Sequence, residues 1–64
     1  MTERELYDEA VVILSKELFS KQDITDLDRI IEAMFAISED SMAGTGLAET
    51  VELIRMDPSR QAGY

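Results

Sequence analysis

Apolar side chains recur at intervals of three and four residues near the start of the chain. The set comprises Leu6, Tyr7, Ala10, Val11, Ile13, Leu14 and Leu18. This spacing is typical of one face of a helix. Thr2 and Glu5 have the spacing of a capping box, in which each side chain satisfies a free backbone N–H of the first turn. The pattern predicts a helix from Thr2 to about Ser20, followed by a short loop at residues 20–22.

A second amphipathic stretch follows, and Asp23 or Thr25 can cap its start. Its apolar residues are Ile24, Leu27, Ile30, Ile31, Met34, Phe35 and Ile37. They cover an arc of roughly 160° at about 100° per residue, which is wider than contact with one neighbour requires. We therefore expect this helix to be central. It should end between Ser38 and Ala43, before Gly44 offers a residue that tolerates a left-handed conformation.

A third, shorter helix is predicted by Leu47, Val51 and Ile54, after the Gly44-Thr45-Gly46 segment interrupts the pattern. Pro58 cannot continue a helix because its ring clashes with the preceding turn. The expected fold class is all-α: a small bundle of two longer helices plus a shorter third, forming one domain over residues 1–58. Residues 59–64 should be a flexible C-terminal tail.

Four apolar residues lie outside the main helical stripes. On a helical wheel, Val12 and Phe19 project opposite the first stripe, while Leu53 and Met56 lie away from the third. A chain of 64 residues buries only about 60% of its unfolded surface, and without cysteine it has no disulfide to reinforce it. We expect these four residues to form a dimer or partner interface, most simply a two-fold homodimer. The alternative is that they are single exposed apolar residues of the kind common on monomers.

Charge narrows the choice of partner. Fourteen acidic residues against six basic ones give a net charge of −8, which favours partners with a basic surface and disfavours direct binding to nucleic acid. Asp28, Glu32 and Glu39 are expected on the outward side of the central helix. Asp28 and Glu32 repel each other at this spacing, so helix stability does not explain them. They serve either solubility or recognition of a basic site on another protein.

Catalytic chemistry has few candidates in this composition. The chain has no histidine and no cysteine, and its acids fall on polar helix faces where they would stay ionised. An EF-hand loop that began at Asp23 would need glycine and glutamate where this chain has Asp28 and Met34. We predict no catalytic residue, no metal site and no cofactor.

Asp40-Ser41-Met42 is similar to the Asp-Ser-Leu motif of acyl carrier proteins, whose serine carries phosphopantetheine at the start of a helix. The later segment 50–53 resembles the continuation of that helix. Two features depart from the family pattern: the glycines after Met42 interrupt the segment, and a helical stretch replaces the family's long first loop. The resemblance therefore does not change the prediction that no cofactor is bound.

Location and function follow from these points. The first residues are acidic, and the longest apolar run, Ala10–Leu14, is too short to cross a bilayer, so we expect a cytoplasmic protein without membrane contact. The leading hypothesis is a non-enzymatic protein-binding module that occupies a basic, nucleic-acid-binding site on a larger protein, as phage-encoded antagonists of host defence or transcription do. The alternative is a structural or regulatory subunit of a helical assembly, bound through apolar contacts.

Overall fold

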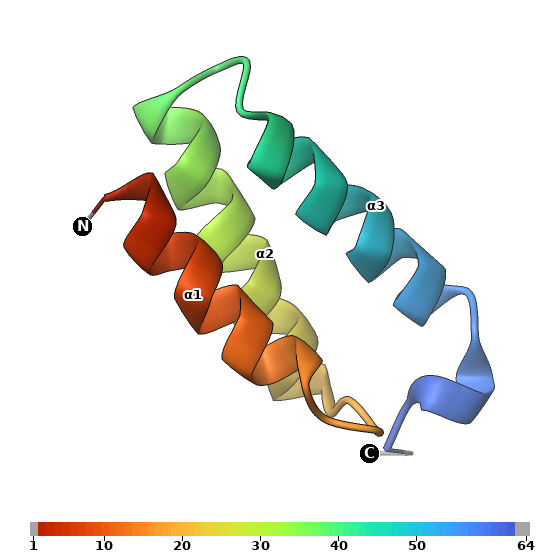
Figure 1. The fold of residues 1–64 in the computed structure, drawn as a ribbon. Coiled ribbons are helices and arrows are strands. Elements are labelled where there is room, and N and C mark those ends of the chain that lie inside the picture. The colour runs from red at the N-terminus through yellow and green to blue at the C-terminus, as the bar shows by residue number, and fades with distance from the viewer. Residues whose placement is uncertain (1, 63–64) are drawn as a thin grey trace.

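Three α-helices follow one another in the computed structural model, which describes residues 2–62 (Figure 1). They are α1 (Glu3–Leu14), α2 (Lys21–Ile37) and α3 (Met42–Arg55), followed by a short 3-10 helix, η1 (Pro58–Arg60). α2 packs against both α1 and α3, whereas α1 and α3 make few direct contacts with each other. The predicted all-helical class is confirmed, and residues 2–62 contain no strand.

The first helix is shorter than predicted and ends at Leu14 rather than near Ser20. With 12 residues it is the shortest of the three, so the prediction that the third helix is the shortest is wrong. The cause is an unrecognised capping box. The Ser20 hydroxyl accepts a hydrogen bond from the Asp23 N–H (3.1 Å), and the Asp23 carboxylate accepts one from the Ser20 N–H (3.0 Å). Because this box starts α2 at Lys21, residues 15–20 must form the turn.

The third helix begins earlier than predicted, because Ser41 caps it by accepting a hydrogen bond from the Gly44 N–H (3.0 Å). Gly44 and Gly46 therefore lie inside the first turns of α3. A Cβ atom on Gly44 would stand 3.2 Å from the Ser41 Oγ and 3.3 Å from the Phe35 ring. The missing side chain lets the start of α3 pack closely on the end of α2, so Gly44 serves packing rather than helix termination.

The core draws on all three helices. Its buried members are Leu6, Ala10, Leu27, Ile30, Ile31, Met34, Leu47 and Val51. All eight belong to the apolar stripes that the sequence pattern predicts. Three other members of the first stripe stay exposed: Tyr7, Val11 and Leu18. The periodicity thus identifies the core but overestimates how much of the α1 stripe is buried.

The C-terminal segment packs against the α1–α2 connection, as Figure 1 shows. The Phe19 N–H donates to the Arg60 carbonyl (2.9 Å), and the Ala62 N–H donates to the Phe19 carbonyl (2.9 Å). The Arg60 guanidinium also lies 5.8 Å from the centre of the Phe19 ring. Residues 59–62 are therefore held by specific contacts, which corrects the prediction of a loose tail over this part. Residues 63–64 of the predicted tail lie outside the described residues.

Candidate protein-binding surface

The three acids predicted to bind a partner do not form one helical stripe. The Asp28 carboxylate forms an ion pair with Arg55 of α3, and the same guanidinium reaches Glu52 at 3.4 Å. Glu32 lies one turn further along α2 and is exposed. Because α2 ends at Ile37, Glu39 lies in the turn before α3, and its predicted place on the central helix is wrong. The pairing with Arg55 reduces the net charge that Asp28 offers to a partner.

Phe19 is not an exposed interface residue, and that prediction is wrong. Its side chain is only 1% exposed, under the C-terminal segment. The helical wheel that placed it beside Val12 assumed a helix to Ser20, whereas α1 ends five residues before Phe19. The polypeptide direction changes in the turn, so the angular position expected for a helix no longer applies.

The other three predicted interface residues are exposed: Val12 by 70%, Leu53 by 62% and Met56 by 75%. Val12 borders a shallow hollow between α1 and α2, beside Arg29 and Ile30. Leu53 borders another hollow between α2 and α3. These residues therefore lie over different helix pairs and do not form one continuous patch.

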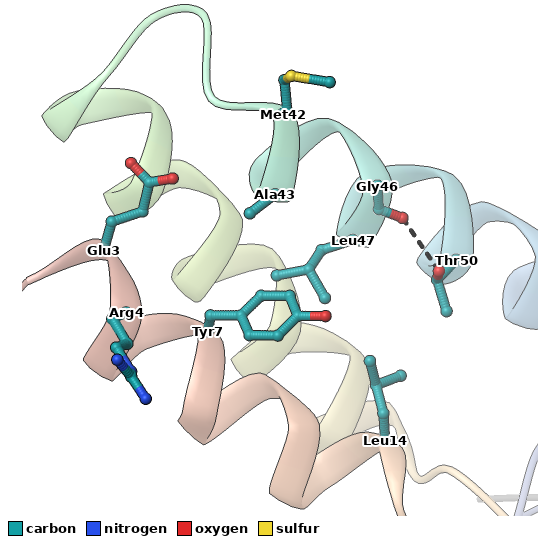
Figure 2. Close-up of a pocket in the computed structure, with 9 residues that line it drawn as sticks. All are labelled: Glu3, Arg4, Tyr7, Leu14, Met42, Ala43, Gly46, Leu47 and Thr50. Atoms are coloured by element: carbon teal, nitrogen blue, oxygen red, sulfur yellow. Dashed lines mark hydrogen bonds between the residues drawn. The ribbon is translucent and has the colours of Figure 1, made fainter.

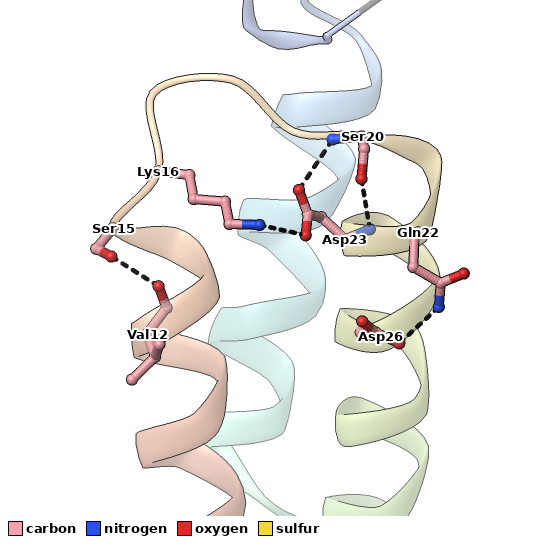
Figure 3. A network of polar contacts seen from close by, with 7 residues as sticks. All are labelled: Val12, Ser15, Lys16, Ser20, Gln22, Asp23 and Asp26. Carbon is pink, nitrogen blue, oxygen red and sulfur yellow. Dashed lines mark hydrogen bonds and ion pairs between the residues drawn. The ribbon is translucent and has the colours of Figure 1, made fainter. Parts of the chain in front are cut away.

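A small polar network fixes the α1–α2 turn, and Figure 3 shows Lys16 reaching from the turn to the start of α2. The Lys16 Nζ lies 2.8 Å from the Asp23 Oδ1. This hydrogen bond, together with the one from the Ser20 backbone, holds the pKa of the buried Asp23 carboxyl below its usual value. The interaction joins the connecting turn to the start of α2 and explains why an acidic side chain is tolerated there.

Two further carboxyl groups have pKa values below their usual range. Hydrogen bonds from Thr2 lower the pKa of Glu5, and hydrogen bonds from Ser59 lower that of Asp57. Both side chains act at the start of a helical turn. A general acid at neutral pH needs a shift in the opposite direction, because it must keep its proton. These groups are instead held in the negative form.

A groove of about 790 Å³ separates α1 from α3 (Figure 2). Its apolar lining comes from Tyr7 and Leu14 on α1 and from Leu47 and Met42 on α3. The sequence pattern assigned Tyr7, Leu14 and Leu47 to helical core stripes. Periodicity identified the correct helix faces, but it carries no information on how far α1 and α3 stand apart. The groove is therefore a feature that the sequence reading missed.

Ser41, the N-cap of α3, contacts Glu3, one of the residues that line this groove. Its hydroxyl donates a hydrogen bond to the Glu3 Oε1 (3.0 Å) while it accepts one from the Gly44 N–H. The residue is 3% exposed. A serine that carries a prosthetic group must present its hydroxyl to solvent, so this geometry argues against the role implied by the resemblance to acyl carrier proteins. The contact ties the start of α1 to the start of α3.

The described part of the chain, residues 2–62, contains no cluster of three or more side chains placed to hold a metal ion. None of its helices is long and apolar enough to cross a membrane. Comparison of the chain with protein-family models, curated proteins and solved structures finds no match.

Proposed function

We propose that this protein is a non-enzymatic binding module that occupies a basic surface on a larger protein, such as a surface that otherwise holds nucleic acid. The observation that carries the proposal is the combination of net charge −8 with large apolar side chains that stay on the surface. These are Tyr7, Val11, Val12, Leu18, Ile37, Met42, Leu53 and Met56. A partner can therefore gain both electrostatic attraction and apolar burial.

The arrangement of charge supports a protein partner with a basic surface. Exposed acids occur on all three helices and in both connections between them, at Glu5, Asp8, Glu9, Glu17, Glu32, Glu39, Asp40, Glu49 and Glu52. Apolar side chains stand among them: Val12 lines the same hollow as Glu9, and Leu53 the same hollow as Glu49. Inhibition of a nucleic-acid-handling protein by occupation of its basic site would follow from such binding.

A second function is favoured by the exposure of Leu53 and Met56 on α3. A structural or regulatory subunit would bury them against another helix, and a homodimer would bury them against a second copy. Binding driven by apolar burial depends little on ionic strength, whereas binding through the acids weakens as salt screens the charges. Ionic strength therefore distinguishes the two functions.

The test is capture of partners from the native host by the immobilised full chain at about 50 mM and about 500 mM salt. We expect a basic protein that is retained at low salt, released at high salt and displaced by duplex DNA. The double variant Glu32→Lys, Glu39→Lys should lose it, because both side chains are exposed. The matched control is Glu32→Gln, Glu39→Gln, which removes charge without reversing it and should retain an intermediate amount.

Retention that is equal at both salt concentrations and unchanged by charge reversal would contradict the leading function and favour the apolar subunit. Turnover of a small molecule by the purified chain would contradict both. The predicted homodimer is checked separately by the mass in solution, which Leu53→Ser should halve if α3 forms its interface.

A further inference from the structure

The groove between α1 and α3 is largely apolar and open to solvent (Figure 2). Met42 at its edge is 88% exposed, and the Tyr7 ring points across it toward α3. We propose that this groove binds a basic amphipathic helix of the partner protein. The proposal rests on the proposed function and adds the shape and chemistry of the bound element.

Backbone chemistry selects a helix as the occupant. Both walls of the groove are helices, so their backbone N–H and C=O groups are already paired within α1 and α3 except at the ends. An extended segment would place its own backbone groups against these walls without partners, which is unfavourable. A helix satisfies its backbone internally and can present one apolar stripe to the groove.

The dimensions give the length of the occupant. At about 1.5 Å per residue, α1 is about 18 Å long and α3 about 21 Å. A bound helix of about 12–14 residues would span the groove. Its apolar side chains would contact Leu14, Leu47 and the Tyr7 ring, which are distributed along the groove rather than gathered at one point.

The α3 wall allows close approach. Ala43 and Gly46 are small, and a Cβ atom built on Gly46 would meet no heavy atom within 4 Å. The space in front of Gly46 is therefore open. Gly46 makes no close packing contact within the protein of the kind that Gly44 makes with Phe35, but it leaves room for the backbone of a docked helix.

Charge selects a basic occupant rather than a second copy. The groove itself contains Glu3 and Arg4, whose formal charges cancel. The chain as a whole carries a net charge of −8, and both helices that form the walls bear exposed acids, such as Asp8 on α1 and Glu49 on α3. Lysines or arginines beside the apolar stripe of a bound helix would be attracted by this field within the Debye length of about 8 Å. A second copy would bring a further net charge of −8 to the groove, so charge favours a basic helix over a second copy at this site.

The test is titration of the ¹⁵N-labelled full chain with a peptide of about 14 residues, in which leucines three and four positions apart form one stripe and lysines fill the remaining positions. Amide shifts should concentrate at Ala43, Gly46 and Thr50 and spare Ala36 on the exposed side of α2. Gly46→Gln should weaken binding at least about tenfold, because it places a polar side chain in the apolar groove. Ala36→Gln introduces the same side chain elsewhere and should bind like the wild type.

The outcomes separate this proposal from the proposed function. Equal affinity of wild type, Gly46→Gln and Ala36→Gln, or an absence of peptide binding to a wild type that still captures its basic partner, overturns the groove and leaves the function standing. Equal binding of the analogue with glutamate in place of lysine overturns the requirement for a basic helix. A self-associated wild type that Gly46→Gln converts to monomers assigns the groove to a second copy and also overturns the proposal. Circular dichroism establishes that both variants keep their helices.

Discussion

At the scale of single residues, the two helical glycines of α3 have different physical roles. Gly44 is buried where α3 meets the ring of Phe35, and a Cβ atom there would be closer to its neighbours than most real Cβ contacts. Gly46 faces open space on the same helix. Glycine in a helix costs about 0.5–1 kcal/mol relative to alanine, so a packing or binding reason is needed for each. Packing supplies the reason for Gly44, and the proposed helix site supplies it for Gly46.

This difference between the two glycines predicts that their alanine substitutions change the free energy of unfolding differently. Gly46→Ala should stabilise the protein by about 0.5–1 kcal/mol, because the new methyl group meets nothing and the unfolded chain loses freedom. Gly44→Ala should gain less or lose stability, because Ser41 and Phe35 must move aside. Urea unfolding followed by circular dichroism measures both values. A larger gain for Gly44→Ala would contradict the packing around that residue.

Asp23 gives the folded state a dependence on pH. Its pKa is lowered by Lys16 and Ser20, so the folded state stabilises the ionised carboxylate. For a lowered pKa, the stabilisation is complete above the usual value of 3.8 and disappears as the pH falls below it, through the folded-state pKa. The free energy of unfolding of the wild type should therefore exceed that of Asp23→Asn at about pH 6, and the difference should shrink toward about pH 3.

The control for this experiment is Asp26→Asn, which changes an acid on the next turn whose carboxylate accepts a hydrogen bond only from Gln22 among the described residues. Its free energy of unfolding should lie close to that of the wild type at both pH values, because the substitution removes no ion pair found among the described residues. A constant difference between wild type and Asp23→Asn over the same range would contradict the role assigned to the Lys16–Asp23 pair.

At the scale of elements, the sequence pattern predicts three helices and the faces that form the core, because amphipathic periodicity records which side of a helix is buried. The residues at which the helices begin and end were harder to predict from the sequence. Leu18 continues the spacing of Leu14, so periodicity alone extends the first helix into the turn. The Ser20–Asp23 capping box instead decides where the turn ends and α2 begins. Continuation of the first helix and formation of this box compete for the residues before Lys21, and periodicity does not show which one is favoured.

The contact between the turn and the C-terminal segment could not be predicted from local pattern, because it joins residues about 40 positions apart in the sequence. The same holds for the groove. The apolar residues that line the groove have helical spacing, but the separation of α1 and α3 depends on how each helix packs on α2. Of the candidate site, the sequence predicted exposure of Val12, Leu53 and Met56 and missed the burial of Phe19.

Because Phe19 is buried in the turn between α1 and α2, truncation of its side chain should lower the stability of the protein strongly. Phe19→Ala should cost about 3–5 kcal/mol, because it leaves a cavity beneath residues 60–62. Leu18→Ala is the matched control. The Leu18 side chain is next to Phe19 in the sequence but is exposed, so its removal should cost less than about 1 kcal/mol. Thermal and urea unfolding give both values. Similar small losses for the two variants would show that Phe19 is not part of the core.

At the scale of the whole molecule, the chain combines a small core with a surface that is both acidic and partly apolar. Self-repulsion among like charges opposes compactness, and exposed apolar side chains favour association. The basic partner that we propose would relieve both at once, because it would neutralise acids and bury apolar surface. The ion pair between Asp28 and Arg55 shows that part of the acidic surface is compensated within the molecule, so the acids outside such pairs carry the proposed interaction.

The proposed recognition of a basic surface is tested by the Kd of the full chain for its captured partner, measured between about 50 mM and about 500 mM salt. We expect the Kd to rise by at least about tenfold over this range, and the charge-reversed variant Glu32→Lys, Glu39→Lys to bind weakly throughout. A Kd that stays constant with salt, and is the same for wild type and variant, would contradict the claim that this protein recognises a basic surface.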